Sequence, residues 1–171
     1  MERDEIFIDL VDHESWFGLL QRFTGGETLF LGPQVRSVPP WPLSYTVWLA
    51  DVGPTNPLHI NVQIYIEDVA TGTGEFGFVP GSHKIDSGPY ERPQFQESMP
   101  GHITFPGKAG TAIMFNSYGW HTAMDNGGSV RKSIILIYEK RTPEKVKPEA
   151  FTAIEQYCTS RERRALFGLE V

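Results

Sequence analysis

The sequence predicts a mainly β protein, a sandwich or barrel of the jelly-roll type with helical segments at both ends. Short strand-like runs separated by Gly and Pro fill residues 27–141, whereas helical apolar spacing is confined to about 8–25 and 143–171. No alternation of strand and helix indicates a parallel α/β sheet. Because 171 residues fall within the usual single-domain range, we expect one domain over residues 1–171.

The first predicted element is a helix near the start of the chain. Its apolar residues recur at the spacing of one helix face: Trp16, Phe17, Leu19, Leu20 and Phe23. We expect Asp12 or Ser15 to cap its first turn. Gly25 or Gly26 should end it, because glycine readily adopts the left-handed conformation found there.

The central region contains seven predicted strands, at residues 28–31, 45–49, 59–67, 75–79, 110–115, 120–124 and 129–140. The clearest is 59–67, where aliphatic and polar side chains alternate and therefore occupy opposite faces. Its polar face offers Asn61, Gln63 and Tyr65 as candidates to line a pocket. The pattern leaves open which face of this strand points inward.

The segments between and after the strands carry distinct signals. Asp125-Asn126-Gly127-Gly128 is typical of a hairpin turn, which would pair the flanking strands and bring His121 near Arg131. Residues 84–109 are rich in Pro and Gly and predict a long irregular excursion, whose loops would set substrate choice. From about residue 148 to 169 the composition favours a helical tail.

Composition and charge narrow the function classes. The formal charge of −6 argues against non-specific binding to nucleic acid or anionic membranes. No apolar run reaches the roughly 20 residues of a membrane helix, and the acidic start lacks the pattern of a signal peptide. The one cysteine, Cys158, cannot form an internal disulfide, so we expect a cytoplasmic protein in a reducing compartment.

Motifs for common enzyme chemistries are missing from the sequence. It contains no Gly-rich phosphate loop, GxSxG elbow, HExxH or CxxC pair, and Cys158 is expected to be a structural thiol. The strongest candidates are His121 and Arg131. An imidazole beside a guanidinium suits a metal ligand next to an anion clamp, since arginine can grip a carboxylate with two parallel hydrogen bonds.

The order of several segments resembles the phytanoyl-CoA dioxygenase family. The likeness covers most of the chain and is carried by residues 10–13 with the following helix, 61–69, Gly74, 79–84, the run 110–131 with Phe115, His121, Asn126 and Arg131, and 159–168. The resemblance implies a double-stranded β-helix core. It also implies Fe(II) held by two histidines and a carboxylate, with 2-oxoglutarate and O₂ used to oxidise a small molecule.

By this resemblance, His121 is the distal iron ligand and Arg131 grips the far carboxylate of 2-oxoglutarate. The other two iron ligands should come from a His-x-Asp motif, but the sequence reads Trp48-Leu49-Ala50-Asp51. Asp51 fits as the carboxylate ligand, whereas Leu49 replaces the first histidine and has no lone pair to donate. His59 could substitute, although it lies eight residues beyond Asp51 at the start of the next strand.

Two function hypotheses therefore stand. The first is an Fe(II)/2-oxoglutarate-dependent oxygenase that oxidises a small hydrophobic metabolite. The second is a catalytically degenerate relative that binds a ligand, regulates a partner or catalyses a metal-free redox-neutral step. The chain before the first helix is shorter than the family norm, so we also expect a homodimer or a partner subunit to cover that side.

Overall fold

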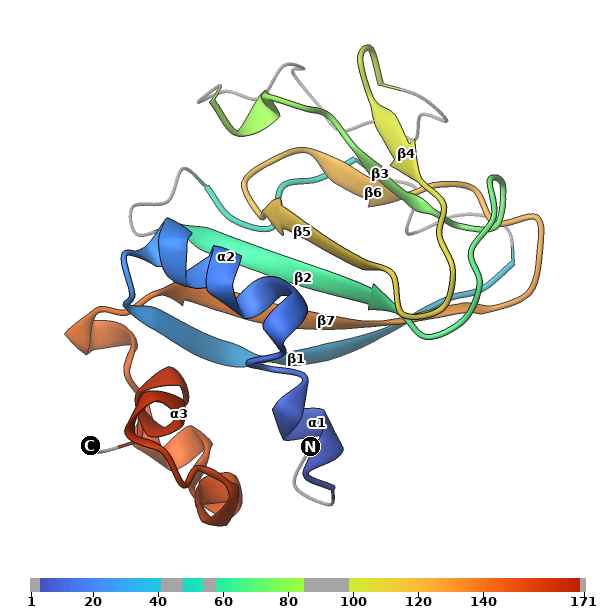
Figure 1. Ribbon diagram of the computed structural model, residues 1–171. Helices are drawn as coiled ribbons and strands as arrows, with labels where there is room; N and C mark the ends of the chain where they lie inside the picture. The colour runs from blue at the N-terminus through green and yellow to red at the C-terminus, as the bar shows by residue number, and fades with distance from the viewer. Residues whose placement is uncertain (1–3, 41–47, 54–57, 85–98, 170–171) are drawn as a thin grey trace. The chain divides into compact units, whose positions relative to one another are not determined.

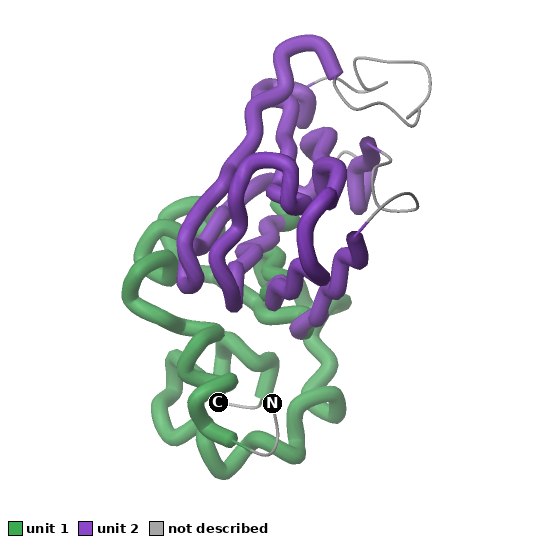
Figure 2. Tube along the Cα trace, turned by 90° about the vertical axis from the view of Figure 1, so that its right-hand side faces the viewer, with its two compact units in different colours: residues 1–32, 56–59, 136–171 green, residues 33–55, 60–135 purple. Residues whose placement is uncertain are grey.

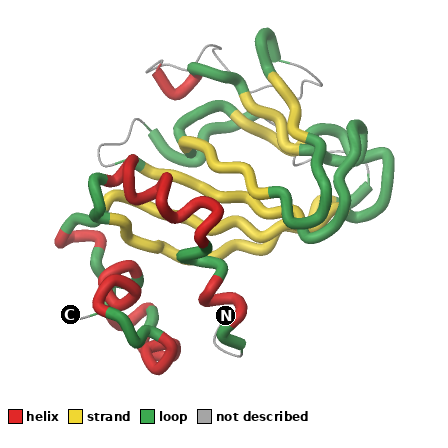
Figure 3. Tube along the Cα trace, viewed as in Figure 1, coloured by secondary structure: helices red, strands yellow, loops and turns green. Residues whose placement is uncertain are grey.

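The computed structural model describes residues 4–40, 48–53, 58–84 and 99–169 and is mainly β (Figures 1 and 3). One sheet has the strand order β1-β7-β2-β5 and the other β4-β3-β6. The prediction of a mainly β jelly-roll core is confirmed. The strands are β1 Thr28–Val38, β2 His59–Tyr65, β3 Phe76–Phe78, β4 Ile103–Phe105, β5 Ala112–Asn116, β6 His121–Ala123 and β7 Arg131–Lys140.

The chain divides into two compact units (Figure 2). The first comprises residues 1–32, 56–59 and 136–171, and the second comprises residues 33–55 and 60–135. The assignment of residues 1–171 to a single domain stays a prediction. In the described part of the chain, every helix falls short of the length and apolar character that a membrane crossing requires.

The first unit contains the N-terminal helices α1 (Ile6–Asp9) and α2 (Glu14–Thr24). The predicted caps of α2 were wrong at its start, because the His13 ring accepts the Ser15 amide at 3.3 Å. Asp12 is occupied elsewhere, by two 2.8 Å hydrogen bonds from Arg163. The predicted end is confirmed, since Gly25 adopts a left-handed φ of 68°.

The tail of the first unit is more broken than the predicted helix. It consists of 3-10 turns at Pro143–Lys145, Pro148–Ala150 and Thr152–Tyr157, followed by α3 (Arg161–Leu166). Prolines open the first two turns, where their missing N–H costs nothing. Cys158 is buried here, and burial raises the pKa of its thiol, as befits a structural residue.

The second unit encloses an aromatic core between β2 and β5 on one side and β3 on the other. Strands β2 and β5 pair antiparallel with Asn61 opposite Phe115, and the rings of Phe115 and Phe76 lie 4.6 Å apart. The polar face of β2 points into this space, because Asn61 and Gln63 are both buried there. The alternation grouped Asn61 and Gln63 on one face but left its direction open, and the structure places both in the wall of a cavity.

The predicted hairpin at residues 125–128 was wrong. The strands that flank it belong to different sheets, since β6 pairs with β3 whereas β7 lies between β1 and β2. The turn residues bond elsewhere: Asn126 donates its side-chain amide to the carbonyl of Val38 at 3.0 Å, and Gly127 N–H reaches the carbonyl of Gly72. These bonds make the segment a crossover between sheets.

Other strand predictions differ in extent. The edge strand β1 continues past the predicted residue 31 to Val38, where an edge position tolerates Pro33. Strand β4 lies inside the predicted irregular excursion 84–109 and pairs with β3. Residues 85–98 of that excursion, and 45–47 of the predicted strand 45–49, lie outside the described residues.

We expect Gly119→Ala to lower the free energy of unfolding by about 1–3 kcal/mol, measured by urea denaturation. A Cβ at Gly119 would overlap the Phe78 ring and lie 3.2 Å from the carbonyl oxygen of Asn116. Gly18→Ala is the matched control, because its Cβ would meet nothing within 4 Å inside α2. That variant should gain about 0.5–1 kcal/mol. An equal change in the free energy of unfolding for the two variants would contradict the close packing of Gly119 against Phe78.

Candidate functional site

A backbone pairing between Leu49 and the first residue of strand β6, His121, builds the site. Leu49 and His121 exchange both of their backbone hydrogen bonds, at 3.0 and 2.9 Å, and the Asp51 amide donates to the carbonyl of Ser117 at 2.9 Å. Directly opposite residues share a face of such a pair, as do residues two apart along one strand. The side chains of Leu49, Asp51 and His121 therefore project to the same side.

These side chains line one cavity of about 110 Å³ in the second unit. Its wall includes the three predicted site residues, Asp51, His121 and Arg131. It also includes Leu49, which stands where the motif of the resembled family has a histidine. The residues relevant to chemistry are Leu49, Asp51, Asn61, Gln63, His121 and Arg131. The structure thus places Asp51, His121 and Arg131 on the wall of one cavity, although the hairpin that was expected to bring His121 near Arg131 is not formed.

The orientation of His121 suits a metal ligand. Its Nδ1 lies 2.8 Å from the carbonyl oxygen of Gly119, which can only accept, so Nδ1 carries a hydrogen. In the neutral ring this leaves the lone pair of Nε2 facing Asp51 Oδ2 at 3.4 Å. Histidine ligands commonly donate their second nitrogen to a carbonyl in this way. The rings of Phe115 and Phe76 pack on the imidazole at 4.8 and 5.7 Å.

The pair His121–Asp51 fits a divalent ion. Bonds of about 2.1 Å from one ion to a nitrogen and an oxygen place two neighbouring donors about 3 Å apart, close to the 3.4 Å observed. Leu49 contributes no donor. Among the described residues, no group of three His, Cys, Asp or Glu side chains could hold a metal. The His, Asp and Leu positions together therefore supply two protein ligands.

Arg131 is a buried cation that hydrogen-bonds a neutral side chain and also interacts electrostatically with the carboxylates of Glu75 and Glu67. Its side chain is 5% exposed, Nη1 donates to Ser133 Oγ at 3.2 Å, and the guanidinium lies 5.7 Å from the centre of the Tyr65 ring. Its Nε has no hydrogen-bond partner in the described structure. Burial lowers the pKa of this arginine. A guanidinium held in this way favours a carboxylate ligand, which would pair its charge.

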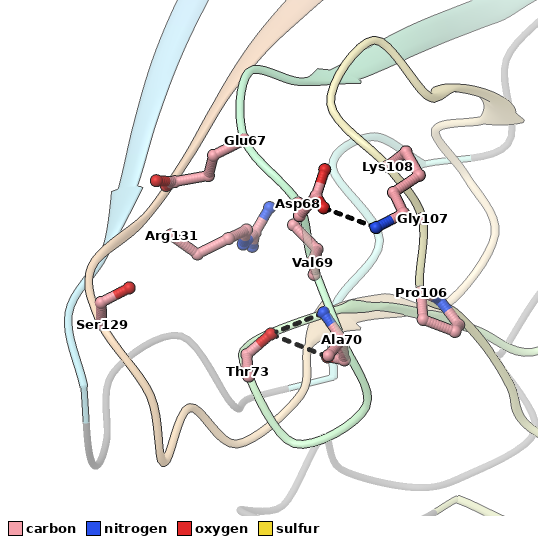
Figure 4. A pocket seen from close by; sticks show the side chains of 10 residues that line it. All are labelled: Glu67, Asp68, Val69, Ala70, Thr73, Pro106, Gly107, Lys108, Ser129 and Arg131. Atoms are coloured by element: carbon pink, nitrogen blue, oxygen red, sulfur yellow. Dashed lines mark hydrogen bonds and ion pairs between the residues drawn. The ribbon is translucent and has the colours of Figure 1, made fainter.

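Arg131 also borders a second cavity of about 460 Å³, shown in Figure 4. Loop residues 67–70 and 106–108 form much of its wall. Lys108 and Asp68 pair at 2.7 Å on its exposed rim, and this contact lowers the pKa of Asp68. Arg131 therefore lines both cavities.

His59, the alternative ligand, has a different neighbour. Its Nε2 lies 3.9 Å from Glu139 Oε1, and it is absent from the described wall of the cavity that contains Asp51. A contact missed by the sequence analysis involves Asn61, whose Nδ2 donates to Asp51 Oδ2 at 2.9 Å. The alternation of β2 placed Asn61 on the polar face, but only the fold reveals its partner.

Comparisons with solved structures show the same fold. The carbocyclase SnoK, described as non-heme and alpha-ketoglutarate-dependent, shares 23% identity with a TM-score of 0.60 over 77% of this chain and 57% of its own. AviO1 from Streptomyces viridochromogenes Tue57 shares 21% with a TM-score of 0.59 over 79% and 60%. HygX from Streptomyces hygroscopicus, solved with nickel and 2-oxoglutarate, shares 12% with a TM-score of 0.64 over 80% and 67%.

The chain spans about three-fifths of the length of the first two of these structures. No curated protein sequence matches it. The sequence model for phytanoyl-CoA dioxygenase (PhyH), however, matches residues 2–133, which include Asp51, His121 and Arg131. With most of its length matched by that model, the chain belongs to the phytanoyl-CoA dioxygenase family.

Proposed function

We propose that the protein is an Fe(II)/2-oxoglutarate-dependent oxygenase that oxidises a small hydrophobic metabolite. The observation that carries this proposal is that Asp51, His121 and the buried guanidinium of Arg131, which can bind an anion, line the same cavity. A metal donor pair and a carboxylate clamp on one wall are what a chelating oxoacid needs. The family supports the same chemistry, and so do the alpha-ketoglutarate-dependent carbocyclase SnoK and HygX, which was solved with 2-oxoglutarate.

Each residue then has a defined role. His121 Nε2 and Asp51 Oδ2 hold the iron, and Arg131 holds the distal carboxylate of 2-oxoglutarate. When bound, iron and the oxoacid supply the oxidising chemistry with O₂. The carbonyl of Gly119 fixes the tautomer of His121, and the Phe115 and Phe76 rings hold the imidazole in place and shield it from water.

The apolar wall supports a hydrophobic substrate. Besides the polar residues, the cavity is lined by Leu49, Phe76, Phe115 and Ile135. SnoN, a similar structure solved with Fe³⁺, alpha-ketoglutarate and nogalamycin RO, is an epimerase from the biosynthesis of that molecule. A small-molecule substrate is therefore proposed here too. The cytoplasmic location and the homodimer or covering subunit stay predictions.

Leu49 favours a second candidate function. It faces the cavity beside His121 and gives the metal one ligand fewer than the family motif provides. Loss of one first-shell nitrogen should weaken metal binding at least as much as the 10–100-fold typical of outer-shell changes. The alternative is a degenerate member that binds a ligand, regulates a partner or catalyses a metal-free redox-neutral step.

Anaerobic titration of metal-free protein with Fe(II) and 2-oxoglutarate tests the proposal directly. We expect a saturable visible charge-transfer band, because the oxoacid chelates iron held by the protein. Asp51→Ala and His121→Ala should each abolish it by removing a ligand. A natural protein without the band, at any iron concentration below precipitation, would favour the degenerate alternative.

Leu49→His should tighten Fe(II) binding by at least about tenfold, measured by the iron dependence of the same band. The pairing of residue 49 with His121 would set the new imidazole beside Nε2 and Oδ2. Leu49→Met is the matched control, since it keeps the apolar character and offers only a weak sulfur ligand. An unchanged affinity in Leu49→His would show that position 49 does not face the metal.

Arg131→Met should lower 2-oxoglutarate affinity at least about tenfold, measured by the oxoacid dependence of the band, because charged hydrogen bonds to the carboxylate are lost. Its urea midpoint should change little, since the gain from removing a buried cation is offset by the loss of its attraction to the buried Glu75. Arg36→Met is the control, an exposed arginine on the same cavity wall. If Arg36→Met lowered 2-oxoglutarate affinity and Arg131→Met did not, Arg36 would be the residue that binds the distal carboxylate.

A further inference from the structure

Asn61 occupies an unusual position in the cavity. It is 3% exposed, and its Nδ2 donates to Asp51 Oδ2 at 2.9 Å, the same oxygen that lies 3.4 Å from His121 Nε2. Its own carbonyl oxygen Oδ1 is fully buried and has no hydrogen-bond partner in the described structure. A buried amide oxygen without a partner is costly, so a ligand for it is expected.

We propose that Asn61 Oδ1 is the third protein ligand of the metal, in place of the missing histidine at position 49. This inference rests on the proposed metal site. A half-turn about the Cβ–Cγ bond exchanges the two ends of the amide and puts Oδ1 where Nδ2 now lies. The carbonyl oxygen then faces the ion held by Asp51 and His121.

The distances agree with this assignment. Two donors at right angles on one ion are about 3 Å apart, and the amide position lies 2.9 Å from Asp51 Oδ2. In the metal-free state the hydrogen bond from Nδ2 keeps Asn61 and Asp51 in register. In the metal-bound state Oδ1 gains the ion, and the half-turn moves the unpaired end of the amide from Oδ1 to Nδ2. The bond to the ion must therefore offset that cost as well as the lost hydrogen bond to Asp51.

The three donors come from three separate segments: Asp51 from the strand-like pair with His121, Asn61 from β2, and His121 from β6. One nitrogen, one carboxylate and one amide oxygen form a harder donor set than two histidines and a carboxylate. Such a set suits Mn²⁺ and Fe²⁺ and leaves three positions of an octahedron open. On this proposal, Leu49 in place of the histidine does not abolish metal binding, because Asn61 supplies the third ligand.

The test uses the whole chain and Mn²⁺ alone, without 2-oxoglutarate. A crystal structure of the Mn²⁺-loaded natural protein, with the ion located by anomalous scattering, should place Asn61 Oδ1 about 2.2 Å from it. In solution, Asn61→Leu should weaken Mn²⁺ binding at least about tenfold by calorimetry, and Asn61→Asp should tighten it. Gln63→Leu is the matched control, a neighbouring buried amide on the same face of β2, and should change affinity less than twofold.

The outcomes separate this inference from the proposed function. An ion bound by Asp51 and His121 with Asn61 more than 3 Å away overturns the inference, even where the charge-transfer band is present. Absence of Mn²⁺ from the cavity at millimolar concentration also overturns it. An ion ligated by Asn61 in a protein that gives no band with 2-oxoglutarate supports the inference and removes the oxygenase proposal.

Discussion

The reciprocal backbone pairing of Leu49 with His121 is the constraint on which the site depends. It sets the register between the segment that carries Asp51 and the strand that carries His121, so that Oδ2 and Nε2 meet at 3.4 Å. A shift of one residue would turn Asp51 away from the imidazole, because successive side chains in an extended segment point to opposite faces. The backbone thus keeps Asp51 beside His121, the arrangement that the proposed metal site needs, although Leu49 itself provides no ligand.

The sequence predicted those features that depend on local periodicity. The alternation of 59–67 identified β2 and its polar face, and Gly25 ended α2 as expected. The turn at 125–128 led to a wrong hairpin prediction, because an Asn-Gly pair is compatible with a hairpin but does not determine which strands pair. Its bonds go to residues 72–74 and to Val38, distant in sequence and therefore invisible to any local pattern.

The site residues show the same division between local and distant information. His121 and Arg131 were predicted from the residues around them and Asp51 from the family resemblance, and the hairpin expected to bring His121 near Arg131 was incorrect. They meet because β6 and β7 lie on different sheets whose side chains line one cavity. The contact between Asn61 and Asp51 joins positions ten residues apart in the sequence, and no spacing rule points to it.

Arg131 and Asn61 each bury a polar atom that has no hydrogen-bond partner in the described structure. A buried guanidinium whose Nε has no hydrogen-bond partner and a buried amide oxygen without one both lower the stability of the unliganded fold in the described structure. Chains that need only a stable core would fill these positions with apolar side chains. Since the two groups lie on the wall that also carries Asp51 and His121, an anion would pair the charge of Arg131, and a cation beside Asp51 would bind the amide oxygen of Asn61. A chelating oxoacid on a metal ion has that charge distribution, negative at its far end and bound to the cation at the other.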